Sequence, residues 1–219
     1  MTNLNKKKFF KVNNFVIGGK GRTFIIAEIG INHEGSLERC KRLIKSASKA
    51  GADGVKIQTV NVNESYEKNS KSYKEFKDKN FSDKQIKELI RFSKKLKLIF
   101  FSTPGDISSL KRLCALKVPI IKISSGLSNN FPLIRETLKN KKPIIISTGF
   151  SDYQDLKELK NYLKKFKFKK IAILKCTSKY PLLNDEVNMS NLIKYKELFD
   201  YPIGYSDHTK DTLTPLIAV

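Results

Sequence analysis

The sequence predicts an α/β fold, a (β/α)8 TIM barrel that lacks its last strand and helix and follows an N-terminal β-hairpin. Strand-like runs rich in Ile and Val alternate with helical patterns along the 219 residues, as in folds built on a parallel sheet. Polar residues follow each run, and the glycine-rich turn of a dinucleotide-binding open sheet is absent. The predicted domains are the hairpin, residues 1–20, and the incomplete barrel, residues 21–219.

The hairpin is expected first along the chain. Two apolar runs, 9–12 and 15–18, flank Asn13 and Asn14, a pair that favours a tight turn between strands. The strand-like runs of the parallel sheet then follow at 24–29, 55–59, 98–103, 120–125, 143–148, 171–177 and 202–206. An eighth strand is needed to close a barrel, and we expect the chain to end before it.

Helical patterns fill most intervals between these runs. They lie at 36–51, 82–97, 106–117, 152–165 and 188–199, and a last one begins near Asp211. Ser36, Ser82 and Asp106 are expected N-caps, and Ser82 forms a capping box with Gln85. Gly51 is expected to end the first helix.

The composition excludes several classes of protein. The formal net charge is +22, but only six of the 43 basic residues are Arg, which is the preferred reader of bases and phosphates. No apolar run reaches the ~20 residues of a membrane span, and residues 1–15 show neither the apolar h-region nor the small-residue cleavage site of a signal peptide. The three cysteines have neither disulfide nor zinc spacing. We therefore expect a soluble cytoplasmic protein without nucleic-acid or membrane partners.

Polar side chains at the carboxyl ends of the strands form the candidate site, because a barrel brings these ends to one mouth. Lys56 and Lys122 are each flanked by apolar residues, and burying an unpaired ammonium is expensive. We expect Glu28 to supply one counter-charge and a bound phosphate or carboxylate the rest; an internal Lys–Glu network is the alternative. The other strand-end residues are Gln58, Ser102, Thr103, Ser124, Ser125, Ser147, Thr148, Thr177, Tyr180, Ser206, Asp207 and His208.

His208, beside Asp207, can be a ligand of a divalent cation, although its neighbours in the sequence suggest no further ligands. His33 is expected only to shape the turn after the first strand. No Ser/His/Asp elbow, P-loop or zinc motif is present. A cationic pocket with a carboxylate suits chemistry on an anionic, phosphorylated small molecule.

Seven segments, in order along the chain, resemble the sialic acid synthase family: IIAEIGINHEGSL, GADGVKIQT, FFSTP, IKISSG, KPIIISTG, LKCTSKYP and IGYSDHT. The family includes N-acetylneuraminate, legionaminate and pseudaminate synthases, and the resemblance runs from about Phe9 to Val219. It implies a barrel enzyme that condenses phosphoenolpyruvate with an N-acetylated amino sugar of the N-acetylmannosamine type. The products would be a nonulosonic acid and phosphate, with Mn²⁺ or Mg²⁺ as cofactor.

The resemblance also implies roles for matching positions. Gln58 and Tyr180 would line the sugar side, and Glu28 would contact sugar hydroxyls or manage a proton. His208 would be one metal ligand. Phosphoenolpyruvate would be held by Lys56, Thr103, Lys122, Ser125, Ser147 and Ser206. Catalytic roles would fall to Glu28, Lys56, Lys122 and His208.

The sequence departs from the family pattern in several places. Leu127 replaces a carboxylate, and Ser178 stands where the family often has Asn. We also expect the chain to lack the eighth strand, which in the family carries a second metal-binding His. We expect it to lack the antifreeze-like C-terminal domain too, which gives an Arg to the partner's site in the family homodimer. We expect the isolated chain to condense these substrates poorly or not at all.

Two alternatives remain open. One is an inactive remnant or split-gene half that needs a second polypeptide. The other is a different phosphoenolpyruvate-dependent synthase of 2-keto-deoxy sugar acids. The sequence also leaves open the N-acyl sugar, the metal and whether this chain dimerises.

Overall fold

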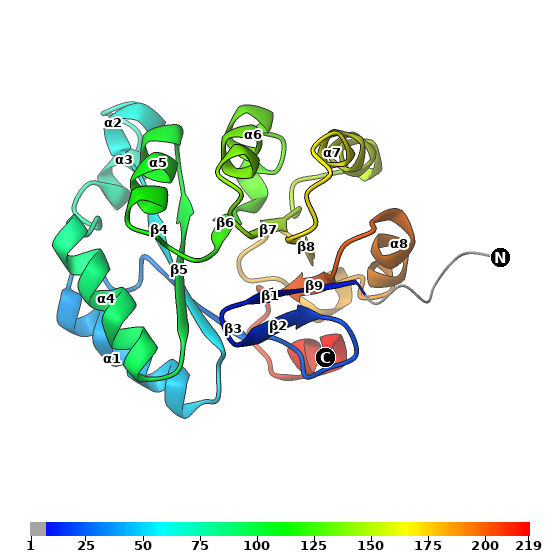
Figure 1. The fold of residues 1–219 in the computed structure, drawn as a ribbon, viewed down its shortest axis with the longest axis horizontal. Coiled ribbons are helices and arrows are strands. Elements are labelled where there is room, and N and C mark those ends of the chain that lie inside the picture. Colours follow the sequence, from blue (N-terminus) through cyan, green and yellow to red (C-terminus); the bar gives the residue numbers. More distant parts are fainter. Residues whose placement is uncertain (1–7) are drawn as a thin grey trace. The chain divides into compact units, whose positions relative to one another are not determined.

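The computed structural model describes residues 8–219, and Figure 1 labels its elements. Its contacts divide into two compact units. The central unit is Phe24–Lys122, and the terminal unit combines the described residues up to Thr23 with Ile123–Val219. The first seven residues of the predicted hairpin domain, 1–20, and of the segment searched for a signal peptide lie outside the described part.

In the central unit, parallel strands pair in chain order and alternate with helices. The strands are β3 (Ile26–Gly30), β4 (Gly54–Thr59), β5 (Ile99–Pro104) and β6 (Ile121–Ile123); the last residue of β6 lies past the unit boundary. The helices are α1 (Leu37–Lys49), α2 (Val62–Ser65), α3 (Lys71–Phe76), α4 (Asp83–Lys95) and α5 (Ile107–Ala115). Apolar residues at helical spacing, among them Ile44, Leu89 and Leu110, are fully buried, as amphipathic helices on a sheet require.

Side chains that cap helices in the central unit do so as the sequence predicts. The Ser36 hydroxyl accepts from the Arg39 amide (3.2 Å). The capping box of α4 is complete, because Ser82 and Gln85 each accept from the other's backbone amide. Asp106 caps α5 by accepting from the Ser109 amide (2.7 Å). These bonds satisfy amide groups that have no partner inside a helix.

The terminal unit combines a hairpin with parallel strands from the end of the chain. Strands β1 (Phe9–Val12) and β2 (Phe15–Gly18) pair antiparallel. Strands β7 (Ile144–Ser147), β8 (Ile171–Cys176) and β9 (Ile203–Ser206) are parallel, in chain order. Its helices are α6 (Phe131–Lys139), α7 (Tyr153–Lys164), α8 (Asn191–Leu198) and α9 (Leu213–Ala218), with short 3-10 turns η1 (Ser125–Leu127) and η2 (Asn184–Glu186).

The hairpin is anchored at the amino end of β9, beside which it runs in Figure 1. Lys8 Nζ donates to the carbonyl of Phe199 (2.6 Å). A side chain at Gly18 would lie 2.7 Å from the Pro202 ring, and Gly18 has φ +85°, a conformation that glycine adopts without strain. The hairpin therefore packs closely against the segment that leads into β9.

Seven parallel strands with their helices and an antiparallel hairpin confirm the predicted fold class. The hairpin bounds are those expected, and each strand lies within two residues of its predicted run. Helices α2, α3 and α6 were not expected; α6 begins with Phe131-Pro132, and proline is tolerated only in the first turn of a helix. No helix within residues 8–219 is long and apolar enough to cross a membrane.

His33 closes the turn after β3, in agreement with the role expected from the sequence. Its side chain is fully buried, its ring lies 4.4 Å from that of Phe81, and its Nδ1 accepts from the Gly35 amide (3.1 Å). Burial, and secondarily the positive charge of Lys79, lowers the pKa of His33 from 6.5 to about 4. The imidazole is therefore neutral in the folded protein at neutral pH.

We expect the free energy of unfolding to fall as the pH drops from 6.5 to about 4. In this window the unfolded chain protonates His33 and the folded chain does not, so stability is lost at about 1.4 kcal/mol per pH unit. Urea unfolding of the wild type and of His33→Gln across this range measures the effect. The wild type should lose more stability than the variant, and equal losses would refute the assignment.

Candidate active site

An ion pair links the first two strands of the central unit. Strand pairing sets Glu28 opposite Lys56, and Lys56 Nζ lies 2.8 Å from Glu28 Oε2. The Lys56 side chain is 4% exposed and that of Glu28 is 56% exposed. The expectation that Glu28 supplies the counter-charge of Lys56 is confirmed. The ammonium is thus held inside the fold while its carboxylate still reaches solvent.

Gln58 and Thr103 lie beyond this pair on the same face of the sheet. They are register partners on β4 and β5, and Gln58 is two positions after Lys56, so it points to the same side. The Thr103 hydroxyl is buried and has no hydrogen-bond partner in the described part of the chain. Ser102 points to the opposite face and donates to the Ile57 carbonyl (3.1 Å). Thr103 therefore offers a free hydroxyl, whereas Ser102 is structural.

Lys122 lies on the same face of the sheet as Thr103, as the pairing of β5 and β6 indicates. Ser102 pairs with Ile121, so the next position brings Lys122 beside Thr103. Lys122 is 7% exposed. The structure thus brings together five of the predicted residues, here called the lysine cluster: Glu28, Lys56, Gln58, Thr103 and Lys122. Two buried ammonium groups and a hydroxyl without a partner suit a phosphate or carboxylate ligand.

A second group of predicted residues surrounds Cys176 in the terminal unit, and we call Ser125, Cys176, Ser206 and His208 the cysteine cluster. Ser206 is the register partner of Cys176, and the thiol lies 3.9 Å from both ring nitrogens of His208. Burial alone would raise the pKa of the Cys176 thiol, but hydrogen bonds with His208, Ser125 and Ser206 outweigh burial and lower it. The thiol is therefore polarised toward the thiolate.

Gly149 lets three polar side chains meet beside this cluster. Its amide donates to Ser125 Oγ (2.9 Å). A Cβ at position 149 would lie 2.3 Å from Ser178 Oγ, 2.9 Å from Ser125 Oγ and 3.0 Å from Cys176 Sγ. Such distances are too short for any side chain, so only glycine leaves these groups in place.

His208 is held at both ring nitrogens. Nδ1 is 2.7 Å from the Thr177 carbonyl, which can only accept, so Nδ1 carries a proton. Nε2 is 2.7 Å from the Tyr180 hydroxyl, and the two rings stack at 3.9 Å. Burial alone would lower the pKa of His208, but Cys176, the Thr177 carbonyl and Asp207 outweigh burial and raise it.

A divalent cation fits this arrangement only in part. An Nδ1–H bonded to a backbone carbonyl is the usual support of a metal-binding imidazole, leaving Nε2 for the metal. Here the Tyr180 hydroxyl occupies Nε2, and Asp207 accepts from Tyr205 and Thr209. No group of three His, Cys, Asp or Glu residues within positions 8–219 could hold a metal. The described residues therefore do not complete a metal site.

The remaining predicted residues of the terminal unit have different surroundings. Ser147 is buried and pairs with Leu174 on β8, two positions before Cys176, so it shares the face of the cysteine cluster. Thr148 instead bonds the Leu174 carbonyl and Tyr195, which ties β7 to β8 and α8. Ser147 is a candidate for the site, and Thr148 is structural.

Two residues of β8 were missed from the sequence. Cys176 was considered only for disulfide or zinc spacing. Lys175 is flanked by apolar Leu174 and by Cys176, as the two predicted lysines are flanked by apolar residues. Its side chain points to the face of β8 opposite that of Cys176. Its Nζ donates to the Val187 carbonyl and to Thr177 Oγ1 (3.0 Å), and burial lowers its pKa. Lys175 thus fastens the segment that carries Tyr180.

The seven parallel strands carry buried lysines and hydroxyls at their carboxyl ends. This arrangement defines a barrel-type protein with polar side chains suited to an enzyme site. The chain belongs to the NeuB family, whose model matches residues 43–219.

Two relatives and one solved structure illustrate the similarity. An N,N'-diacetyllegionaminic acid synthase of Campylobacter jejuni is 36% identical over 214 residues, covering 90% of this chain and 64% of the relative. The human N-acetylneuraminate-9-phosphate synthase is 34% identical over 217 residues, covering 93% and 60%. A sialic acid synthetase from Leptospira borgpetersenii, crystallised with citrate, superposes with a TM-score of 0.92 at 32% identity, covering 97% and 74%. The chain thus spans about three fifths of these curated relatives.

Removing the carboxylate of the buried ion pair should destabilise the protein. Glu28→Gln leaves the Lys56 ammonium without its counter-charge, and because Glu28 is half exposed we expect a loss of about 1–2 kcal/mol. The control is Glu34→Gln, which breaks an exposed pair with Arg39 and should cost less than about 1 kcal/mol. Lys56→Met in the Glu28→Gln background should recover stability. Urea unfolding gives all four values, and equal losses in the two single variants would refute the idea.

Releasing Lys175 should loosen the segment after β8. Lys175→Met keeps the apolar stem but removes the bonds to Val187 and Thr177. We expect faster amide hydrogen exchange in residues 177–187, by roughly tenfold for a net loss of about 1.4 kcal/mol. Lys179→Met, which removes an exposed pair with Glu186, is the control in the same segment. If both variants exchange like the wild type, Lys175 does not fasten it.

Proposed function

We propose that this protein condenses phosphoenolpyruvate with an N-acyl amino sugar of the N-acetylmannosamine type, giving a nonulosonic, sialic-type acid and phosphate. A new bond joins C3 of phosphoenolpyruvate to the aldehyde carbon of the open-chain sugar. Water adds at C2, the C2–O bond breaks and phosphate leaves. The observation that carries the proposal is the lysine cluster, found in a chain of the NeuB family.

The lysine cluster suits the anionic substrate. The ammonium groups of Lys56 and Lys122 and the free hydroxyl of Thr103 match the phosphate and carboxylate of phosphoenolpyruvate, since charge-assisted hydrogen bonds are the strongest available. Gln58, the one residue of β4 that is not fully buried, is assigned to the sugar. One carboxylate oxygen of Glu28 pairs with Lys56. The other carboxylate oxygen is assigned to a sugar hydroxyl or a proton.

Residues of the terminal unit complete the assignment on the strength of family membership. Ser125, Ser147 and Ser206 are assigned to phosphoenolpyruvate, and the exposed Tyr180 to the sugar. We propose His208 as one ligand of a divalent cation, Mn²⁺ or Mg²⁺, with the other ligands coming from outside the described residues.

A second candidate function is that of a partial protein that binds phosphoenolpyruvate but needs a second polypeptide to turn over. The incomplete set of metal ligands within residues 8–219 favours it. This candidate differs from the first in one outcome: the protein alone would bind phosphoenolpyruvate without catalysing the condensation.

The test is phosphate release from phosphoenolpyruvate with Mn²⁺, and product detection by mass spectrometry. We expect slow release that requires N-acetylmannosamine or a deoxy analogue, since residues 8–219 offer His208 alone as a proposed ligand of the cation. Omitting the sugar is the control. Release only with an aldose phosphate would indicate a different synthase of 2-keto-deoxy sugar acids. Binding of phosphoenolpyruvate without release supports the second candidate, and neither binding nor release contradicts both.

A further inference from the structure

A recess of about 290 Å³ lies in the terminal unit, away from the cysteine cluster. It is bounded by the end of α7, the segment leading into β8 and the residues just before β9. It therefore lies at the amino ends of β8 and β9, whereas the cysteine cluster lies at their carboxyl ends. Four ammonium side chains line it, those of Lys160, Lys164, Lys167 and Lys169.

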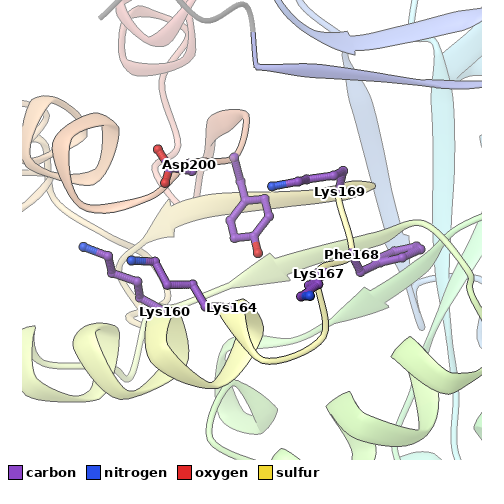
Figure 2. A pocket seen from close by; sticks show the side chains of 7 residues that line it. Lys160, Lys164, Lys167, Phe168, Lys169 and Asp200 are labelled. Carbon is purple, nitrogen blue, oxygen red and sulfur yellow. The ribbon is translucent and has the colours of Figure 1, made fainter. Parts of the chain in front are cut away.

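The four lysines surround the recess from different segments. In Figure 2, Lys160 and Lys164 reach from α7 toward the side where Asp200 lies, and Lys169 approaches from the other side. None of the four forms an ion pair with another described residue. Ammonium groups gathered around one hollow repel each other, so the folded state gains when an anion binds among them.

The one carboxylate of the lining is already engaged. Asp200 Oδ1 lies 3.7 Å from Lys8 Nζ, and Lys8 also donates to the Phe199 carbonyl (2.6 Å). The charge of Asp200 is therefore compensated from outside the recess. Five lysines, counting Lys8, against one carboxylate leave a local charge of +4.

The walls strengthen the attraction for an anion. Tyr201 is 7% exposed and Phe168 is half-buried, so aromatic surface replaces water along part of the recess and lowers the local dielectric. Burial, with the charge of Asp200, raises the pKa of Tyr201. Its phenol keeps its proton at neutral pH and adds no negative charge.

We propose that this recess binds a small anion with a chain of two or three phosphate groups. Its volume is at the lower end of the range of small-molecule sites, about 300–1,000 Å³, which suits a short phosphate chain rather than a polymer. A di- or triphosphate carries about three to four negative charges, which matches the local charge. The phosphate chain can be inorganic or belong to a nucleotide.

The test is a calorimetric titration of the 219-residue chain with tripolyphosphate. We expect saturable binding of one equivalent that weakens by about tenfold or more in Lys164→Gln/Lys167→Gln/Lys169→Gln. The control variant, Lys87→Gln/Lys94→Gln/Lys95→Gln, makes the same charge change on the exposed face of α4 and should bind like the wild type. Circular dichroism verifies that both variants are folded. Parallel titrations with ATP and with AMP show whether a nucleoside adds to the affinity.

Phosphoenolpyruvate separates this site from the lysine cluster. Saturating phosphoenolpyruvate should leave tripolyphosphate binding unchanged. The proposal for the recess can therefore be refuted while the proposed function stands, and the proposed function can be refuted while the recess still binds. Equal weakening of tripolyphosphate binding in both triple variants, or binding without saturation, would indicate general attraction to the net charge of +22. Either result would overturn the proposal. Unchanged binding of tripolyphosphate by the recess variant would overturn the proposal too. So would an oligonucleotide that binds more tightly than tripolyphosphate and whose binding both triple variants weaken equally.

Discussion

The structure depends most on the ammonium group of Lys56, which is buried in a parallel strand and held 2.8 Å from Glu28. An uncompensated charge at this depth would drive the strand apart or lose its proton. The pair solves this with one carboxylate on the neighbouring strand. Half of that carboxylate stays in water, so the ammonium keeps capacity for another anion. Lys122 and the free hydroxyl of Thr103 lie on the same face and extend this capacity.

The terminal unit follows a different principle, in which small side chains permit close polar contacts. Gly149 leaves room for Ser125, Ser178 and Cys176 to approach one another. The thiol is polarised by Ser125, Ser206 and His208, although no such role was expected of a cysteine. On the other face of β8, Lys175 ties down the segment that carries Tyr180. Local rigidity here comes from buried hydrogen bonds around two charged or polarisable side chains.

Patterns of apolar residues predicted most of the fold, because most of the parallel strands are short runs buried on both faces and most helices bury one continuous face. Helix α6 escaped prediction because its buried stripe is short and Pro132 stands just before it, in the first turn. The pair formed by Glu28 and Lys56 was predictable, since a buried lysine needs a partner. Lys175 and Cys176 were not recognised, because alternation within a strand tells which residues share a face but not what packs against it. The partners of Cys176 come from distant chain segments, and Lys175 bonds residues of the loop that follows its own strand; a single sequence reveals neither arrangement.

The central claim is that the lysine cluster holds the anionic substrate. Calorimetric titration with phosphoenolpyruvate, without any sugar, tests it most directly. The account predicts saturable binding by the wild type and by Lys95→Gln, which changes an exposed lysine of α4. It predicts weakening by about tenfold or more in Lys122→Gln, which removes one charge-assisted bond. Equal affinity of Lys122→Gln and Lys95→Gln for phosphoenolpyruvate would contradict the claim.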